Sequence, residues 1–282
     1  MARRIASKYL ASPELQQSAV ITRAVESHEQ QPAYYLFTNV GDDKYVVVSG
    51  ESRLNEVVGY GKMSPNADKS VVKEFKTLLQ RYERVVRAVR EGKAQVPPIR
   101  LPKIREVKPL LTCHWEQNYP FNQYTPAPDG VNTPTGCVAT ATAQLMYYHK
   151  WPKSRPNAYI FSQGTEAQKS AGYQWQYMKD YAKQMDNKGG DAVGVLMRDV
   201  GKAVRMHYYY KGSDSNLHYA MDALRNDFGY SVRHLYKDYM LSGAFYDVIL
   251  NELSDGYPVL VCGGSHVFVF DGYDRRGFIH TN

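Results

Sequence analysis

The sequence predicts an α+β protein made of two units, and three observations support this class. Residues 34–61 consist of β-branched and aromatic runs parted by polar turns, which indicates a local antiparallel sheet. Between residues 136 and 256 the apolar residues recur with helical spacing, and short apolar runs return only near the end of the chain. A proline-rich segment, residues 93–111, separates the two patterns. Helices and strands segregated in this way are typical of α+β architecture.

The first unit is predicted to be an antiparallel sheet with one covering helix. Residues 34–40 and 44–50 form a hairpin around Gly-Asp-Asp, and residues 56–61 form a third strand. Residues 71–93 then carry an apolar stripe at helical spacing, with lysines and arginines largely on the other faces. The stripe comprises Val72, Phe75, Leu79, Tyr82, Val86 and Val89, and Gly92 ends the helix.

The segment 93–111 is predicted to link two domains. Its prolines disfavour helix and favour an extended, exposed path. They are Pro97, Pro98, Pro102 and Pro109. An ordinary loop inside one domain is the alternative interpretation. Because linkers of this composition usually lie between domains, we expect one unit at residues 1–103 and a second at residues 104–282.

The second unit is predicted to place its helices first and its strands last. Its first helix lies in residues 136–151 and ends before Pro152, since proline cannot continue a helix. Further elements follow the same reasoning from periodicity. The helices are expected in residues 191–206, 216–229 and 243–256, and the strands in residues 258–264, 266–274 and 277–282.

Charge and hydropathy narrow the function classes. The formal charge is +7, but residues 1–103 hold 17 Lys and Arg against 11 Asp and Glu, whereas residues 104–282 hold 18 against 17. The excess positive charge lies in the first unit. No nucleic-acid motif accompanies it, so we expect no nucleic-acid partner. No apolar run approaches the roughly 18 residues that a membrane helix needs, so we expect no membrane partner either.

No cofactor or metal is expected. His207, His218 and His234 are scattered along the sequence and lack a second ligand at helical spacing. No phosphate-binding loop of the Walker or dinucleotide type is present. The cysteines are too few and too widely spaced for a disulfide framework or a CxxC metal site. They are Cys113, Cys137 and Cys262.

Cys137 is the strongest candidate for a nucleophile, because it follows Thr-Gly and opens a predicted helix. The thiolate is the nucleophilic form of cysteine, and the unpaired amides at a helix start favour negative charge. Gly136 permits a tight backbone turn, and the small residues 139–143 permit close packing. A buried cysteine in a helix of small residues is the alternative interpretation.

A cysteine nucleophile needs a base, and His266 is the candidate among the eight histidines. It opens an apolar strand in which His266, Phe268 and Phe270 share one face. A histidine satisfied by hydrogen bonds at a strand end is the alternative. Acyl transfer also needs donors for the oxyanion, for which the Cys137 amide and the Gln117 side chain are candidates. Taken alone, Gln117 is more typical of a surface glutamine.

Three segments, in this order, resemble the streptopain family of papain-like cysteine peptidases. TGCVATATAQLMYYHKWP, residues 135–152, is similar to that family's cysteine segment. WEQNYPFN, residues 115–122, resembles its oxyanion-glutamine segment, and GGSHVFVFDGYDRRGFIHTN, residues 263–282, resembles its histidine segment. Upstream, residues 34–61 are similar to the strands of the family's propeptide.

The resemblance implies a papain-like catalytic domain, with a helical part and an antiparallel sheet, behind a pro-domain of antiparallel sheet plus helix. It makes Cys137 the nucleophile, His266 the base and later the acid, and Gln117 an oxyanion donor. Residues 1 to about 103 would be a pro-domain that inhibits the enzyme intramolecularly until the proline-rich linker is cleaved. Peptides and proteins would be the substrates. The family also implies secretion, with a signal peptide already removed.

Three features depart from the family pattern. Ser265 and Val267 flank the histidine where smaller residues are usual, so we expect both to crowd the cleft. The chain stops at Asn282, where the family continues with a Trp-Gly-Trp-Gly-Gly-like segment, and this predicts a C-terminally incomplete catalytic domain. Asn282 and the missing tryptophan are the candidates for orienting His266. Loss of an orienting group predicts a poor enzyme.

Two other functions stay open at this level. A catalytically impaired relative could bind peptides or inhibit a partner, although the retained Cys137 and His266 argue against it. Another acyl-transfer enzyme, such as a transamidating one, would use the same thiolate chemistry, because a fold does not determine the acceptor. The preferred prediction is a secreted cysteine endopeptidase in its proenzyme form.

Overall fold

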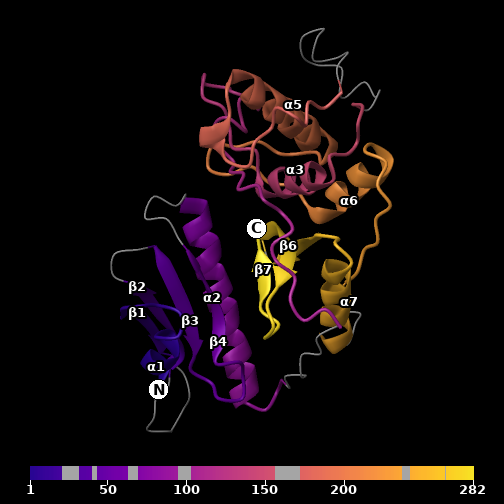
Figure 1. Ribbon diagram of the computed structural model, residues 1–282. Helices are drawn as coiled ribbons and strands as arrows, with labels where there is room; N and C mark the ends of the chain where they lie inside the picture. Colours follow the sequence, from indigo (N-terminus) through magenta and orange to yellow (C-terminus); the bar gives the residue numbers. More distant parts are fainter. Residues whose placement is uncertain are drawn as a thin grey trace. The chain divides into compact units, whose positions relative to one another are not determined.

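The computed structural model describes residues 1–20, 32–39, 43–62, 69–94, 103–155, 172–236, 242–263 and 265–282 of the chain. They belong to two compact units, Met1–Pro98 and Ile99–Asn282 (Figure 1). Each unit contains helices and antiparallel strands, which confirms the α+β prediction. The predicted domain boundary between residues 103 and 104 stays a prediction, and residues 95–102 of the linker lie outside the described residues.

The first unit is a four-stranded antiparallel sheet in the order β1-β2-β3-β4, packed against a long helix (Figure 1). The predicted strands and helix are confirmed. The short helix α1 and strand β1 were not predicted, because five helical residues and a largely polar strand leave no periodic apolar signal. The elements are α1 (Ala2–Ala6), β1 (Pro13–Val20), β2 (Pro32–Asn39), β3 (Lys44–Ser49), β4 (Val57–Lys62) and α2 (Lys69–Arg90).

The predicted apolar stripe of α2 is the face that packs on the sheet. Leu79 and Val86 are buried in one cluster with Tyr34 of β2 and Val47 of β3. The lysines and arginines that were predicted to lie elsewhere are exposed. Burial of this stripe removes apolar surface from water, which is the main source of stability for such a helix.

A buried carboxylate ties the end of α2 to the sheet. Glu51, 8% exposed, accepts hydrogen bonds from Arg53 Nε at 2.7 Å and from Arg90 Nε at 3.2 Å. The Arg90 guanidinium also donates to the carbonyls of Pro32 and Gly50, at 3.2 and 3.1 Å. The hydrogen bonds from Arg53 lower the pKa of Glu51 to about 2, against the effect of burial. Glu51 is therefore charged in the folded unit.

We predict that Glu51→Gln destabilises the first unit by about 1–3 kcal/mol at neutral pH, because the two arginines lose their charged partner. The folded pKa of Glu51 is depressed, so its contribution is fully present above about pH 4.5 and fades as the pH falls toward about 2. Hydrogen exchange of the α2 amides in the full chain measures the loss.

Glu56→Gln is the matched control, because its ion pair with Lys8 spans 3.8 Å and both side chains are more than half exposed. Protection of α2 should stay unchanged in that variant. Equal loss of protection in the two variants would show that the buried Glu51 cluster adds nothing to the stability of the first unit.

Within its described residues, the second unit places the α-helices α3, α5, α6 and α7 before an antiparallel sheet in the order β5-β6-β7 (Figure 1). Every predicted helix and strand of this unit is confirmed, with ends shifted by a few residues. For example, one helix begins four residues before its predicted start because the Asp186 side chain accepts from Gly189 N at 2.8 Å and caps it. The elements are α3 (Cys137–His149), η2 (Ala182–Gln184), α5 (Asn187–Ala203), α6 (Leu217–Asn226), α7 (Ser242–Ser254), β5 (Val259–Gly263), β6 (His266–Tyr273) and β7 (Ile279–Thr281).

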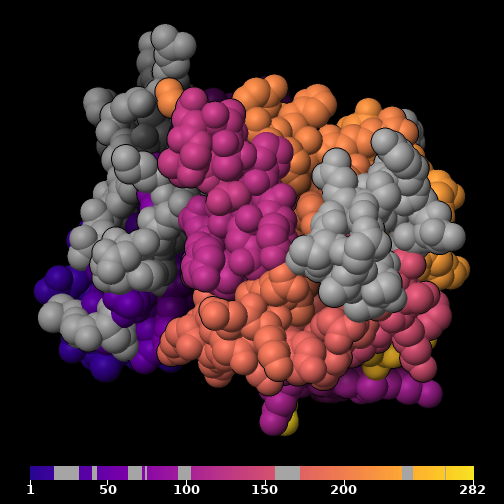
Figure 2. Space-filling view, turned by 90° about the horizontal axis from the view of Figure 1, so that it is seen from above, coloured from indigo at the N-terminus to yellow at the C-terminus, as the bar shows by residue number. Residues whose placement is uncertain are grey.

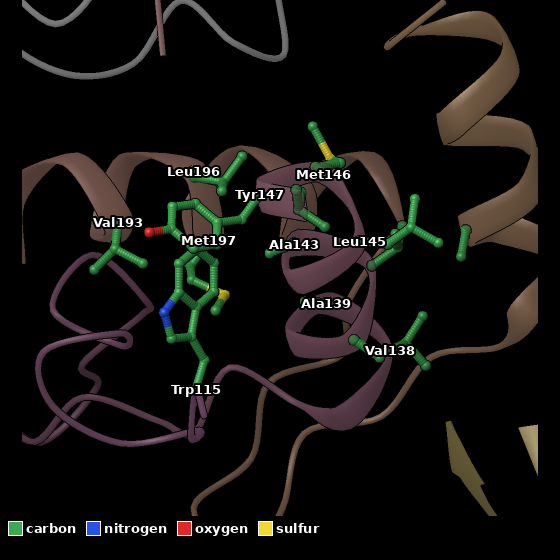
Figure 3. Packing of buried hydrophobic residues seen from close by; sticks show 14 of the residues in the cluster. Trp115, Val138, Ala139, Ala143, Leu145, Met146, Tyr147, Val193, Leu196 and Met197 are labelled. Atoms are coloured by element: carbon green, nitrogen blue, oxygen red, sulfur yellow. The ribbon is translucent and has the colours of Figure 1, made fainter. Parts of the chain in front are cut away.

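Helix α3 lies in the centre of this unit, and all its residues from Val138 to Tyr147 are buried. Figure 3 shows Trp115 and Tyr147 against Leu196 and Met197 of α5. The rings of Trp115 and Tyr147 lie 4.6 Å apart between centroids. The small residues of α3 let neighbouring elements approach closely, as predicted. None of the described helices is long and apolar enough to cross a bilayer.

Candidate active site

Cys137 is the first residue of α3, as predicted, and its side chain is half-buried. The other two thiols lie in different surroundings. Cys113 is 1% exposed, and burial raises the pKa of its thiol to about 12, while Cys262 is exposed on β5. Cys137 is thus the cysteine that combines a helix start with partial access to solvent, which is the setting of reactive thiols.

The backbone before Cys137 depends on glycine. Gly136 has φ 82° and ψ 145°, a conformation essentially restricted to glycine. A Cβ placed on Gly136 would lie 2.6 Å from Met206 Sδ and 2.9 Å from the Ser213 carbonyl oxygen. The chain segment 206–213 therefore packs directly against the residue before the thiol, and only glycine fits there.

Gln117 lies beside this helix start, although its local sequence gave no sign of it. Its carbonyl accepts a hydrogen bond from Thr135 N at 3.0 Å, two residues before Cys137. Trp115 and Phe121, both buried in the core, hold the segment on either side. The Gln117 side chain is half-buried, and no hydrogen bond to its amide is found within the described ranges. An amide in this position can donate to an oxygen bound near Cys137.

His266 opens β6, as predicted, and its ring stacks on Phe268 with centroids 5.9 Å apart. Burial alternates along the strand, and Val267 and Val269 lie in the same core cluster as α3. The strand of His266 thus packs under the helix of Cys137, and Figure 1 shows β6 next to α3. The prediction that Val267 crowds the cleft is wrong, because its side chain is 4% exposed within the core. Ser265 is exposed.

Asn282 joins β6 to α3 rather than contacting the imidazole directly. Its backbone exchanges two hydrogen bonds with Val269, at 2.9 and 3.1 Å. Its side chain accepts from Gln144 Nε2 of α3 at 2.8 Å and donates to the Cys113 carbonyl at 2.7 Å. Because paired residues of neighbouring strands share a face, the Asn282 side chain lies on the Val269 face of the sheet, opposite to that of His266. In this arrangement the Asn282 amide does not orient the His266 ring directly.

Several residues of the site region were not found from the sequence. Asp271 of β6 is fully buried, accepts from Leu111 N at 3.0 Å, and lies 2.6 Å from His280 Nδ1. A carboxylate inside an apolar strand is a signal that could have identified it. Gln144 and Met206 carry no such signal, because their importance arises from contacts with residues far away in the sequence.

Two histidines that are 16 positions apart in the sequence, His218 and His234, lie close together in the fold. The rings of His218 and His234 lie 5.1 Å apart between centroids, and Tyr236 Oη is 2.6 Å from His218 Nε2. Burial and then the neighbouring His218 lower the pKa of His234. Among the described residues no group of three or more His, Cys, Asp or Glu could hold a metal ion.

Comparisons with known proteins identify the family of this chain. A model of the Peptidase C10 family matches residues 115–282, which include Gln117, Cys137 and His266. The chain belongs to the Peptidase C10 family. The resemblance to the streptopain family is thereby confirmed. A model described as Spi protease inhibitor matches residues 1–86, which lie in the first unit.

Individual relatives of this C10 chain cover both units. It is 29% identical over 285 residues to the thiol protease/hemagglutinin PrtT of Porphyromonas gingivalis, covering 91% of this chain and 33% of that protein. It is 28% identical over 279 residues to streptopain of Streptococcus pyogenes, covering 86% of this chain and 69% of streptopain. The chain thus spans about a third of one of these relatives.

A solved structure supports the papain-like, two-part fold of this C10 chain. The structure of a prointerpain A fragment from Prevotella intermedia matches with a TM-score of 0.73 and 24% identity. The match covers 94% of this chain and 87% of that one. The predicted fold class is confirmed.

We predict that Gly136→Ala destabilises the catalytic unit by about 3 kcal/mol or more, because backbone strain of roughly 1–3 kcal/mol adds to the contacts with Met206 and Ser213. Gly130→Ala is the matched control, since Gly130 also has positive φ (76°) but nothing lies within 4 Å of its Cβ position. Gly130→Ala should lower the free energy of unfolding only by the backbone strain. Denaturant unfolding followed by tryptophan fluorescence reports on this unit, where Trp115, Trp151 and Trp175 all lie. Equal losses in the two variants would refute the packing argument.

Proposed function

We propose that this chain is the zymogen of a secreted cysteine endopeptidase that hydrolyses peptide bonds through an acyl-enzyme. The observation that carries the proposal is the placement of Cys137, a half-buried thiol at the start of a buried helix in a chain of the Peptidase C10 family. Membership of the family and the inhibitor-type first unit support a peptidase with its own inhibitory domain.

In the proposed reaction His266 accepts the thiol proton and the Cys137 thiolate attacks the scissile carbonyl carbon. The oxyanion receives hydrogen bonds from the Cys137 amide and from the Gln117 side chain. The C–N bond then breaks, the amine leaves with the proton held by His266, and a thioester remains. Water, deprotonated by His266, hydrolyses the thioester and restores the thiol. No cofactor is required by these steps.

Asn282 is proposed to act as a positioning residue rather than as a group that touches the imidazole. Its backbone holds the strand that carries His266, and its side chain holds Gln144 of the helix that carries Cys137. A clamp between these two elements limits their relative movement, and displacements of about 1 Å at a catalytic pair can cost on the order of 100-fold in rate.

The first unit is proposed to inhibit the second intramolecularly, and protein and peptide substrates are proposed for the processed enzyme. The match of residues 1–86 to a protease inhibitor family supports the first part. The names of two relatives, a thiol protease and streptopain, support the second. Secretion is proposed from the family resemblance.

We predict that a peptidyl epoxide, which alkylates catalytic thiolates, modifies Cys137 in the processed protein and leaves Cys113 unmodified. The reagent cannot reach Cys113, which is 1% exposed, and burial raises the pKa of that thiol to about 12, so it stays protonated and unreactive. Peptide mapping by mass spectrometry locates the label. In addition, Cys137→Ala should abolish peptide hydrolysis.

Cys262→Ala is the control, because Cys262 is exposed but lies on β5 rather than at a helix start. This variant should keep both labelling and turnover. Hydrolysis that persists in Cys137→Ala, or a label found at Cys262, would contradict the assignment.

We predict that the full chain is latent and that limited proteolysis between Ala94 and Glu106 releases activity. The first described residues after the linker bind to strand β6 of the second unit. Tyr273 Oη donates to the Ile104 carbonyl at 2.6 Å, and Val107 pairs with Tyr273. Cuts before Ile104 leave these contacts intact and should give the most active product. N-terminal sequencing and a peptide substrate measure the cut and the activity.

The Cys137→Ala chain, treated with the same protease, is the control for contaminating activity. It should give the same fragments without activity. Equal activity of the wild-type chain before and after cleavage would show that the first unit is not an inhibitor.

A further inference from the structure

Two surface loops of the catalytic unit are locked together by one phenol. Tyr210 Oη donates to Asp129 Oδ2 at 2.7 Å and accepts from Asp129 N at 2.8 Å, although the two residues are 81 positions apart. Both are exposed. In Figure 2 the magenta surface of the chain before α3 adjoins the orange surface of the chain beyond residue 200. One hydroxyl therefore uses both its donor and its acceptor to hold a loop.

The base of the loop that carries Tyr210 lies against the residues just before the nucleophile. His207 and Asp214 pair through two backbone hydrogen bonds of 2.9 and 3.0 Å and close a hairpin, residues 206–214. Ser213 Oγ donates to the Pro134 carbonyl at 2.6 Å, and the Ser213 carbonyl packs on Gly136. A movement of hairpin 206–214 would therefore displace Gly136, the residue before Cys137.

The loop that carries Asp129 is braced by its own polar side chains. Asn132 Nδ2 donates to the Thr125 carbonyl at 2.9 Å, and Thr125 Oγ1 donates to the Thr133 carbonyl at 2.6 Å. The loop, residues 122–133, continues to Thr135, whose amide binds the Gln117 carbonyl. Loop 122–133 thus connects Asp129 to the segment of the proposed oxyanion donor, and hairpin 206–214 connects Tyr210 to Gly136.

We propose that Tyr210 is a positioning residue for peptide hydrolysis, locking hairpin 206–214 to loop 122–133 so that the two form one rim beside Cys137 on which an extended peptide substrate binds. The inference rests on the proposed peptidase function. The exposed side chains of Tyr209 and Val131, 59% and 63% exposed, give this rim apolar surface for substrate side chains. A rim that is already ordered lowers the entropy cost of binding.

The chemistry of the lock suits this role. A phenol that donates to a carboxylate makes a charge-assisted hydrogen bond, stronger than one between neutral groups. This hydrogen bond raises the pKa of Tyr210, so the phenol remains a donor at neutral pH. Removal of the hydroxyl leaves the ring in place and deletes both bonds to Asp129.

The test compares two alkylating agents on the protein after cleavage of its linker. A peptidyl epoxide needs the rim in order to bind, whereas iodoacetamide needs only the Cys137 thiolate. For Tyr210→Phe we expect the KI of the epoxide to rise roughly threefold to tenfold, as for loss of an exposed hydrogen bond to a charged group. Its kinact and the rate of Cys137 alkylation by iodoacetamide should stay unchanged. Asp129→Asn should act in the same direction, and the double variant should be no worse than the single ones.

Tyr257→Phe is the matched control, because it removes an exposed hydroxyl outside hairpin 206–214 and loop 122–133, and no side-chain hydrogen bond to this hydroxyl is found in the described part of the chain. Its KI should equal that of the wild type. The proposal is overturned if Tyr210→Phe leaves KI unchanged, if Tyr257→Phe raises KI equally, or if iodoacetamide reactivity falls together with epoxide binding. It is also overturned if Cys137 reacts with iodoacetamide but no variant binds the epoxide. Wild-type Cys137 that fails to react with either reagent would instead refute the proposed function.

Discussion

The close packing at Gly136 is the constraint on which the second unit depends. Without a side chain at this position, the Met206 sulfur and the Ser213 carbonyl can approach the backbone, and the chain can turn with positive φ into α3. Helix α3 is then buried along its length, which is expected of a helix with apolar or small residues on every face. Its first residue, Cys137, combines this support with partial access to solvent.

Other elements of the unit are joined to the same helix by few but specific contacts. Strand β6 packs under α3 through Val267 and Val269, and Asn282 connects that strand to Gln144. The segment of Gln117 reaches the helix start through Thr135. The proposed nucleophile, base and oxyanion donor stand on separate segments and need such cross-connections, because sites are precise only when a supporting layer of residues holds them.

The cysteines show how environment separates reactivity from residue type. Cys113 lies in the core, where burial disfavours the thiolate, and its carbonyl rather than its thiol contributes by binding Asn282. The first unit illustrates the same principle with a carboxylate. Glu51 is buried, yet the arginines around it keep it charged, and the cluster fastens α2 to the sheet. For Cys113 burial decides the protonation state, whereas for Glu51 the neighbouring arginines outweigh the effect of burial.

The sequence by itself determined the α+β class, the order of the helices and strands other than α1, β1 and η2, and the positions of Cys137 and His266 at the starts of their elements. These properties depend on periodicity and on capping, which are encoded in neighbouring residues. The placement of Gln117 beside the helix, the core position of Val267, the clamp by Asn282 and the lock between Tyr210 and Asp129 were decided only by the tertiary structure. Their partners lie up to 169 positions away, as for Asn282 and Cys113. Such pairs form only when the whole unit packs, so no local pattern announces them.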